Sequence, residues 1–235
     1  AAKARHGMNE AIARLSTGVR SMYGGDAAGA SVAHTLRADG RSALMAARNV
    51  EDGISFLQAG EAALLEIAAL NTRLRELAVQ DLNAAFLDAN QEAAITAEEA
   101  AIVAAGNAID TATLNNVALL TAGIGFTTDM DGTLTTLGAA AGLTLAAGVS
   151  NVDTQMGKIS KALGSMAAGI AALKGHQGTL YALSANAEAA AARIQDTDFA
   201  RSSANLAKFS ILNQSAMAMV SQANQANAAV LAVLN

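Results

Sequence analysis

The chain has 235 residues and a formal net charge of −5, and 52% of its residues are hydrophobic although only 3% are aromatic. It contains no cysteine and no proline, which excludes disulfides, Cys-ligated zinc and a thiol nucleophile and permits long uninterrupted helices. The acidic balance argues against nucleic acid as a partner, because neutralising phosphates requires a basic face.

The N-terminal stretch "AAKARHGMNEAIARLSTG" carries basic residues but no apolar core of the kind that signal peptides have, so no cleaved signal is expected. The chain begins without an initiator methionine, so further residues are expected upstream. No run of about 18 uncharged apolar residues is present, and no membrane span is expected.

The next feature is the loop "GGDAAGA" at 24–30. Two glycines allow backbone angles that other residues avoid, and Asp26 is a candidate N-cap for a following helix. The loop is either a tight turn or a shaped interaction loop.

A helix is predicted over about 42–80, where apolar residues recur at intervals of three and four. Its 39 residues would span roughly 60 Å at the usual helical rise. The apolar row consists of Val50, Ile54, Leu57, Leu64, Ile67, Leu74 and Leu77.

Charge is concentrated in this helix around "LRELAVQ" at 74–80. Arg73, Glu76 and Gln80 fall on one outer face, and Leu74 and Leu77 fall on the buried row. An exposed Arg–Glu pair adds little stability, and no catalytic partner is nearby. The pattern therefore favours a surface that faces another protein.

The middle of the chain breaks the helical pattern after a short row of Ile95, Ile102 and Ile109. Residues 119–151 are rich in Gly and Thr, and Asp131-Gly132 predicts a hairpin turn between short strands. "DMDGT" at 129–133 does not fit a calcium loop, which needs Gly at its sixth position and Glu at its twelfth. No metal and no cofactor are expected.

The C-terminal half shows heptad spacing, which predicts a long helix packed on a partner helix. One row is Leu163, Ile170, Gln177, Ser184 and Ala191, and the other is Met166, Leu173, Leu180, Ala187 and Ile194. A last helix is predicted over 199–235, with an uncharged polar face after Lys208 and an apolar row that includes Leu206, Phe209, Leu212, Met219, Val230 and Leu234. Such a helix is marginal alone, so residues 200–235 are expected to be the least stable part of the chain.

No constellation of residues predicts an enzyme. His6, His34 and His176 are far apart, and none has a second ligand at metal-binding spacing. Glu98 and Glu99 are adjacent on a predicted helix, so they do not face each other.

Several motifs resemble, in order and spacing, the terminal regions of bacterial flagellins. The N-terminal ones are "EAIARLSTGVRS" (10–21), "GGDAAGASVA" (24–33), "ARNVEDGISFLQAGEAALLEI" (47–67) and "RLRELAVQ" (73–80). The C-terminal ones are "RIQDTDFARSSANLAKFSILNQSAMAMVSQANQ" (193–225) and "VLAVLN" (230–235). Fewer residues precede the first motif than in the family, so a truncated N-terminus is expected, and Asn115-Asn116 replaces the family's Asn-Gly turn.

The resemblance implies a mainly α fold, an elongated antiparallel long-helix bundle or coiled coil with a small β-hairpin region. The implied regions are 1–118 (N-terminal helical), 119–151 (hairpin and loop), 152–198 (C-terminal helix of the rod) and 199–235 (inner-core coiled-coil helix). It also implies a motility filament outside the cell that assembles through paired terminal helices, and export through the flagellar apparatus.

The partners implied by the resemblance are other copies of the chain, the filament cap, hook-junction proteins and an export chaperone. Some family members are recognised by an innate immune receptor, which would contact Arg73, Leu77 and Glu98 here. Two alternatives stay open: a hook–filament junction protein, and a flagellin-like cell-surface protein that binds a polysaccharide or host ligand.

Overall fold

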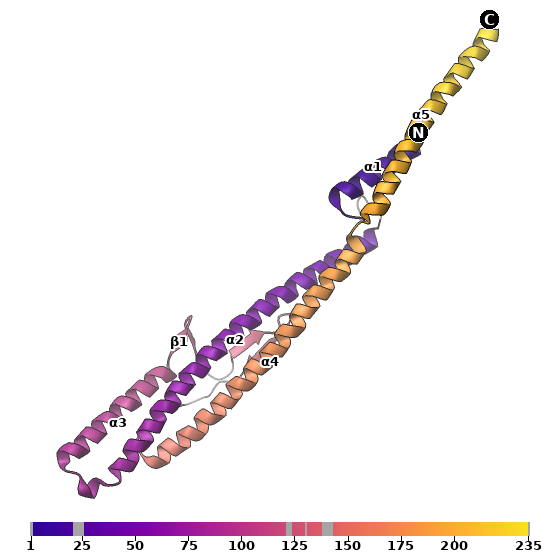
Figure 1. The fold of residues 1–235 in the computed structure, drawn as a ribbon. Coiled ribbons are helices and arrows are strands. Elements are labelled where there is room, and N and C mark those ends of the chain that lie inside the picture. The colour runs from indigo at the N-terminus through magenta and orange to yellow at the C-terminus, as the bar shows by residue number, and fades with distance from the viewer. Residues whose placement is uncertain (1, 21–25, 121–123, 130, 138–142, 235) are drawn as a thin grey trace. The chain divides into compact units, whose positions relative to one another are not determined.

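The computed structural model describes the chain except for residues 1, 21–25, 121–123, 130, 138–142 and 235, and the side chains of residues 84 and 228–234. The chain forms two compact units: Ala1–Gly40 with Ala185–Asn235, and Arg41–Ser184. We call these the terminal unit and the central unit. The predicted mainly α bundle of long helices with small β-hairpins is confirmed (Figure 1).

The helices are α1 (Ala2–Thr17), α2 (Ala27–Asp81), α3 (Ala89–Asp110), α4 (Val149–Gln195) and α5 (Phe199–Leu234), with the 3₁₀ turn η2 (Ala84–Phe86) between α2 and α3. Helix α2 begins well before the predicted start at about residue 42. Asp26 accepts a hydrogen bond from the Gly29 backbone N–H at 2.8 Å, which confirms it as a helix-capping residue. The early turns of α2 lack a row of large apolar residues, so the spacing of such residues could not reveal them.

The core of the central unit lies between α2 and α4. The helices are antiparallel, since Glu51 meets Gln177 and Asn71 meets Val152. The predicted rows are buried here: among the large side chains that are fully buried are Leu57, Leu64, Ile67, Leu74, Met166 and Leu173. Gln177, a polar member of the seam, donates from Nε2 to the Glu51 carboxylate at 2.8 Å, and the Tyr181 hydroxyl reaches the same oxygen at 2.6 Å.

Two small antiparallel strand pairs belong to the central unit. In the first, β1 (Thr113–Leu114) pairs with β2 (Val117–Ala118). Asn115 and Asn116 join them with φ of 51° and 65°, the left-handed geometry of a two-residue hairpin turn. The sequence prediction did not include these strands, because two-residue strands carry almost no periodicity.

The second pair, β3 (Ile124–Thr127) with β4 (Leu134–Leu137), confirms the predicted hairpin. Gly132 has a φ of 80°, but the connection is longer than a two-residue turn because Thr127 pairs with Leu134. The Phe126 side chain packs the hairpin against α2. A Cβ on Gly53 would lie 2.7 Å from the Phe126 ring, so only glycine permits this approach.

In the terminal unit, α1 packs antiparallel to α5, and the connection before α2 pairs with the connection before α5. Val19 and Asp196 form a β-bridge, flanked by the Arg20 N–H donating to the Gln195 carbonyl at 2.8 Å and the Thr197 N–H donating to the Gly18 carbonyl at 2.9 Å. Gly18 has a φ of 69°, which favours glycine. The bridge thus ties the start of the chain to its last third.

Helix α2 is long and apolar enough to cross a membrane, and it is the one such helix in the described residues. Length and composition are weak evidence, because the core helix of a soluble protein passes the same test. The apolar residues Leu57, Leu64 and Ile67 of α2 are buried in the core of the central unit. The absence of a membrane span stays a prediction.

Candidate functional site

The first candidate surface lies where α2 and α3 run side by side (Figure 1). Helix α3 begins with a capping box: the Asp88 carboxylate accepts from the N–H groups of Asn90 and Gln91, and the Gln91 side chain accepts from the Asp88 N–H. This fixes the start of α3 after a short connection. As a result, Glu98 of α3 faces Arg73 of α2.

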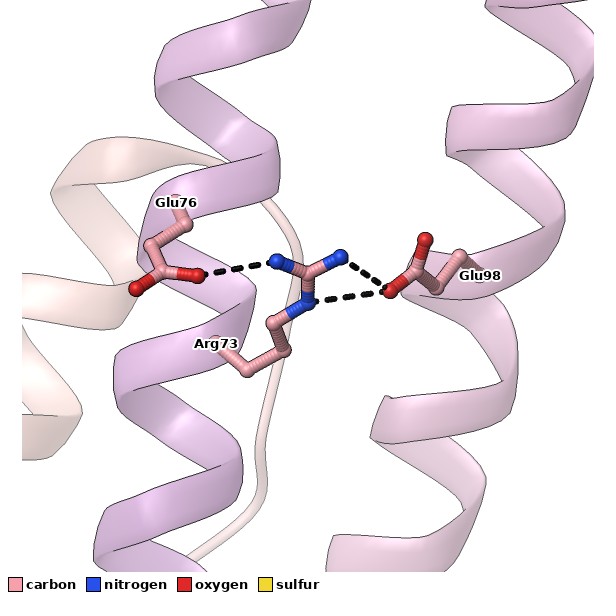
Figure 2. A network of polar contacts seen from close by, with 3 residues as sticks. All are labelled: Arg73, Glu76 and Glu98. Carbon is pink, nitrogen blue, oxygen red and sulfur yellow. Dashed lines mark hydrogen bonds and ion pairs between the residues drawn. The ribbon is translucent and has the colours of Figure 1, made fainter.

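Arg73 is the centre of a three-residue polar network, which we call the Arg73 surface: Arg73, Glu76 and Glu98 (Figure 2). Its Nε and Nη2 donate to Glu98 Oε1 at 3.0 and 2.7 Å, and its Nη1 donates to Glu76 Oε2 at 2.9 Å. The hydrogen bonds to Glu98 and then to Glu76 raise the pKa of Arg73 above its usual value. The three side chains are 51%, 61% and 45% exposed, so another protein can reach them.

Leu77 does not belong to this exposed surface. It is 2% exposed, and Leu74 is fully buried, as their place in the apolar row predicts. The buried side of α2 is tied to α4 nearby: Asn71 Nδ2 donates to the Val152 carbonyl at 3.0 Å. The structure therefore brings Arg73 and Glu98 together and places Leu77 in the core, where it supports the surface from below.

Two carboxyl groups on α3 have raised pKa values. Burial raises the pKa of Glu99, and the negative charge of Asp81 adds to the effect. Burial alone raises the pKa of Asp110. Within the described ranges, no group of three or more His, Cys, Asp or Glu residues could hold a metal ion.

The second candidate surface is on α5. Leu206 and Phe209 are half-buried, whereas Leu212 is 46% and Met219 is 71% exposed. The side chains of Val230 and Leu234 lie outside the described residues. The exposed large apolar residues in the described part of α5 are Phe199 at its start and, further along, Ile211, Leu212, Met217, Met219 and Val220. We call the last five residues the α5 apolar segment; with about 3.6 residues per turn they are spread around the helix.

The sequence did not predict which residues hold α1 against α5. Phe209 lies directly over Gly7, where an added Cβ would be 2.6 Å from the ring. A glycine inside a helix often marks such a close approach, and that signal was available at Gly7. The partner residue could not be identified, because the two lie at opposite ends of the chain.

Both ends of the chain match known protein families. A family model described as the bacterial flagellin N-terminal helical region matches residues 1–125, and one described as the C-terminal helical region matches residues 149–234. Flagellin from Halalkalibacterium halodurans is 32% identical, over 96% of this chain and 91% of the relative. The flagellar filament core protein flaB2 of Brachyspira hyodysenteriae is 32% identical over 97% and 92%, and flagellin FlaB2 of Treponema pallidum is 31% identical over 95% and 91%.

Long antiparallel helix pairs that carry exposed ion-pair and apolar side chains, together with these matches, place the chain among helical structural proteins. The chain belongs to the bacterial flagellins. It is a structural subunit of the flagellar filament, which lies outside the cell at its surface. A hook–filament junction protein and a surface-binding protein are not favoured, because the relatives named above are flagellins and a filament core protein.

Proposed function

We propose that this subunit joins the filament through the α5 apolar segment. The observation that carries the proposal is the exposure of large apolar side chains along one helix, from Ile211, which is 63% exposed, to Val220, which is 54% exposed. Large apolar side chains clustered within ten residues of one exposed helix are costly in water and are typical of protein–protein contacts. Burial between copies would remove that cost.

The test is assembly of two variants that add the same charge to α5. Met219→Glu places a carboxylate in the α5 apolar segment and should abolish filament formation, because burying an unpaired charge is unfavourable. Gln214→Glu adds the charge at an exposed polar position and should assemble as the unchanged chain does. Electron microscopy and sedimentation measure the result. Normal filaments from Met219→Glu would disprove the proposal.

The Arg73 surface is proposed as a second contact surface, for a neighbouring subunit or an innate immune receptor. Its support is the exposed, pre-organised arrangement of Arg73 with Glu98. Arg73→Ala should reduce receptor signalling by the soluble chain. Arg75→Ala is the matched control, because Arg75 also makes an exposed ion pair, with Asp153 on α4 at 2.8 Å. Equal signalling by both variants would exclude a receptor role.

Leu77 enters this second proposal as a positioning residue. Because its side chain is buried, Leu77→Ala should lower signalling only as far as it loosens α2. Measuring signalling together with thermal unfolding separates the two effects. A loss of signalling with unchanged unfolding would instead require that the receptor reach Leu77 directly.

The proposed partners beyond the filament itself are the filament cap, hook-junction proteins and an export chaperone that covers α5. The proposed export route is the flagellar apparatus without a cleaved signal, which suits a chain that contains no cysteine. Secretion by strains with and without a working export apparatus tests the route. The mass of the secreted chain, compared with that of the cytosolic chain, tests the absence of cleavage.

A further inference from the structure

Two methionines of the α5 apolar segment are open to solvent in the single chain. Met217 is 63% exposed and Met219 is 71% exposed. By contrast, Met166 of α4 is fully buried in the core of the central unit. Reagents dissolved in water can therefore reach the first two side chains but not the third.

The two exposed methionines lie on different sides of α5. Residues two positions apart in an α-helix are separated by about 200° around its axis, at 3.6 residues per turn. One helix packed along α5 can therefore cover Met217 or Met219, but not both. A protein contact on either of these two sides buries a methionine, and both are buried only where α5 is enclosed from several sides.

The composition of the chain directs oxidation to its methionines. The chain has eight methionines but no cysteine and no tryptophan, so no thiol competes for a peroxide. Hydrogen peroxide transfers one oxygen atom to the thioether sulfur, which loses two electrons and becomes a sulfoxide. The O–O bond breaks, and the other peroxide oxygen leaves as water. The reaction replaces an apolar sulfur with a polar S=O group.

A sulfoxide changes what the α5 apolar segment can contact. The other members of the segment, Ile211, Leu212 and Val220, are aliphatic and donate no hydrogen bond from their side chains. A sulfoxide oxygen that is buried among such side chains loses its hydrogen bonds to water without replacement, which is unfavourable. In the free subunit the same group stays hydrated. Oxidation therefore favours the free subunit over the assembled one.

We propose that Met217 and Met219 are an oxidation site that controls whether the subunit can assemble. A peroxide converts them to sulfoxides in the free subunit and prevents α5 from joining the filament. Assembly covers the same side chains and protects them. The inference rests on the proposed function of the α5 apolar segment and adds its regulation. Methionine sulfoxide reductases, which return the thioether, make the change reversible.

Mass spectrometry after brief treatment with hydrogen peroxide tests the site itself. Cleavage after Lys208 releases Met217 and Met219 on one peptide that contains no other methionine. In the free subunit this peptide should gain oxygen about tenfold faster than the peptide that contains Met166. In assembled filaments its oxidation should slow. Equal rates for the two peptides of the free subunit, or an unchanged rate in filaments, would overturn the inference.

Elongation from filament seeds tests the control of assembly. Peroxide should raise the concentration that the chain needs for elongation by about tenfold, the effect expected for an unpaired polar group at a buried contact. In Met217→Leu/Met219→Leu, compared with its own untreated sample, peroxide should change that concentration little. The matched control is Met45→Leu, which removes a 53% exposed methionine of α2 and should stay as sensitive as the unmodified chain. Equal sensitivity of the double variant and the control would overturn the inference.

Enzymatic reduction separates sulfoxide formation from other oxidative damage. Methionine sulfoxide reductases with a dithiol reductant should restore elongation, and the reductant alters no disulfide because the chain contains no cysteine. Circular dichroism checks that the oxidised chain stays folded. Complete reduction of Met217 and Met219 without recovery of elongation would assign the loss to another group and overturn the inference.

The Met219→Glu variant distinguishes this inference from the proposed function. Normal filaments from Met219→Glu would disprove the proposed function, whatever peroxide does. If Met219→Glu fails to assemble but the chain oxidised at both methionines elongates normally, the inference is wrong and the proposed function stands.

Discussion

The central and terminal units are both helical, but they bury different kinds of side chain. The buried apolar residues of the central unit include large aliphatics such as Leu64, Ile67 and Leu173. In the terminal unit, every described residue in this buried apolar class is an alanine: Ala4, Ala11, Ala33, Ala187 and Ala191. The contrast shows how one chain combines a thick core with a thin helix–helix seam.

This difference has an energetic consequence. Burying a leucine removes far more apolar surface from water than burying an alanine does, and the free energy gained is roughly proportional to that surface. The central unit therefore contains most of the stabilising burial. The terminal unit relies on close backbone approach, as at Gly7 and Phe209, and on half-buried side chains that another chain could cover.

The largest expected effect is from truncation in the central core. Leu173→Ala should lower the free energy of unfolding by about 2–5 kcal/mol, because Leu173 is fully buried and its loss leaves a cavity. Leu65→Ala, at an exposed position of α2, should change it by less than about 0.5 kcal/mol. Urea unfolding of both variants measures the difference. Similar midpoints would contradict the thick-core description.

A smaller effect should appear in the terminal unit. Gly7→Ala places a methyl group against the Phe209 ring, so the ring must move and the α1–α5 contact should weaken by about 1 kcal/mol. Gly164→Ala on α4 is the control, because its Cβ would meet nothing within 4 Å; this change should stabilise the helix by about 0.5–1 kcal/mol. Amide exchange should accelerate in α1 for the first variant only. Unchanged protection of α1 would show that the seam tolerates a wider spacing.

The third effect concerns pH and Glu99 in the central unit. Burial, and then Asp81, raise the pKa of Glu99 in the folded state, so folding favours its protonated form. The associated stability is complete below the unfolded pKa of about 4.5 and is lost as pH rises through the folded pKa. Glu99→Gln should therefore raise the urea midpoint at pH 7 and leave it nearly unchanged at pH 4. Glu66→Gln, on an exposed face of α2, is the control, and an equal gain there would point to net charge as the cause.

The smallest effect is expected at the Arg73 surface. Because Arg73, Glu76 and Glu98 are exposed to solvent, their ion pairs are screened and add little stability. Arg73→Ala should give a urea midpoint indistinguishable from that of Leu65→Ala. A loss as large as that of Leu173→Ala would mean that the network holds α3 on α2 and would assign it a structural role.

The elements predicted from the sequence are those with strong periodicity. The rows from Val50 to Leu77 and from Met166 to Leu180 identified the seam of the central unit, because large apolar residues at three-and-four spacing identify a buried face. The start of α2 was missed, since its first turns bury only a small residue, Ala33. Small residues fit both buried and exposed positions, so they give no clear pattern.

The candidate site was predictable only in part, for a related reason. The outer face of Arg73 and Glu76 followed from helical spacing, but the pairing of Arg73 with Glu98 depends on how α3 folds back after Asp88. Nothing in the sequence indicated that Phe86 is exposed, although its side chain is 89% exposed in the structure. A phenylalanine next to leucines in a sequence is ordinarily a core residue, and only the tertiary structure shows that nothing within the described chain covers it.

The bridge between Val19 and Asp196 has a consequence for the order in which the chain folds. Nearby, Arg20 Nε donates a hydrogen bond to the Ile194 carbonyl at 3.1 Å, and these two residues are 174 positions apart in the chain. Closing so long a loop is slow, because its entropy cost comes before any contact compensates for it. The terminal unit needs both ends of the chain, whereas the central unit needs neither. A subunit that emerges from a narrow passage end first would therefore complete its central unit early and its terminal unit last.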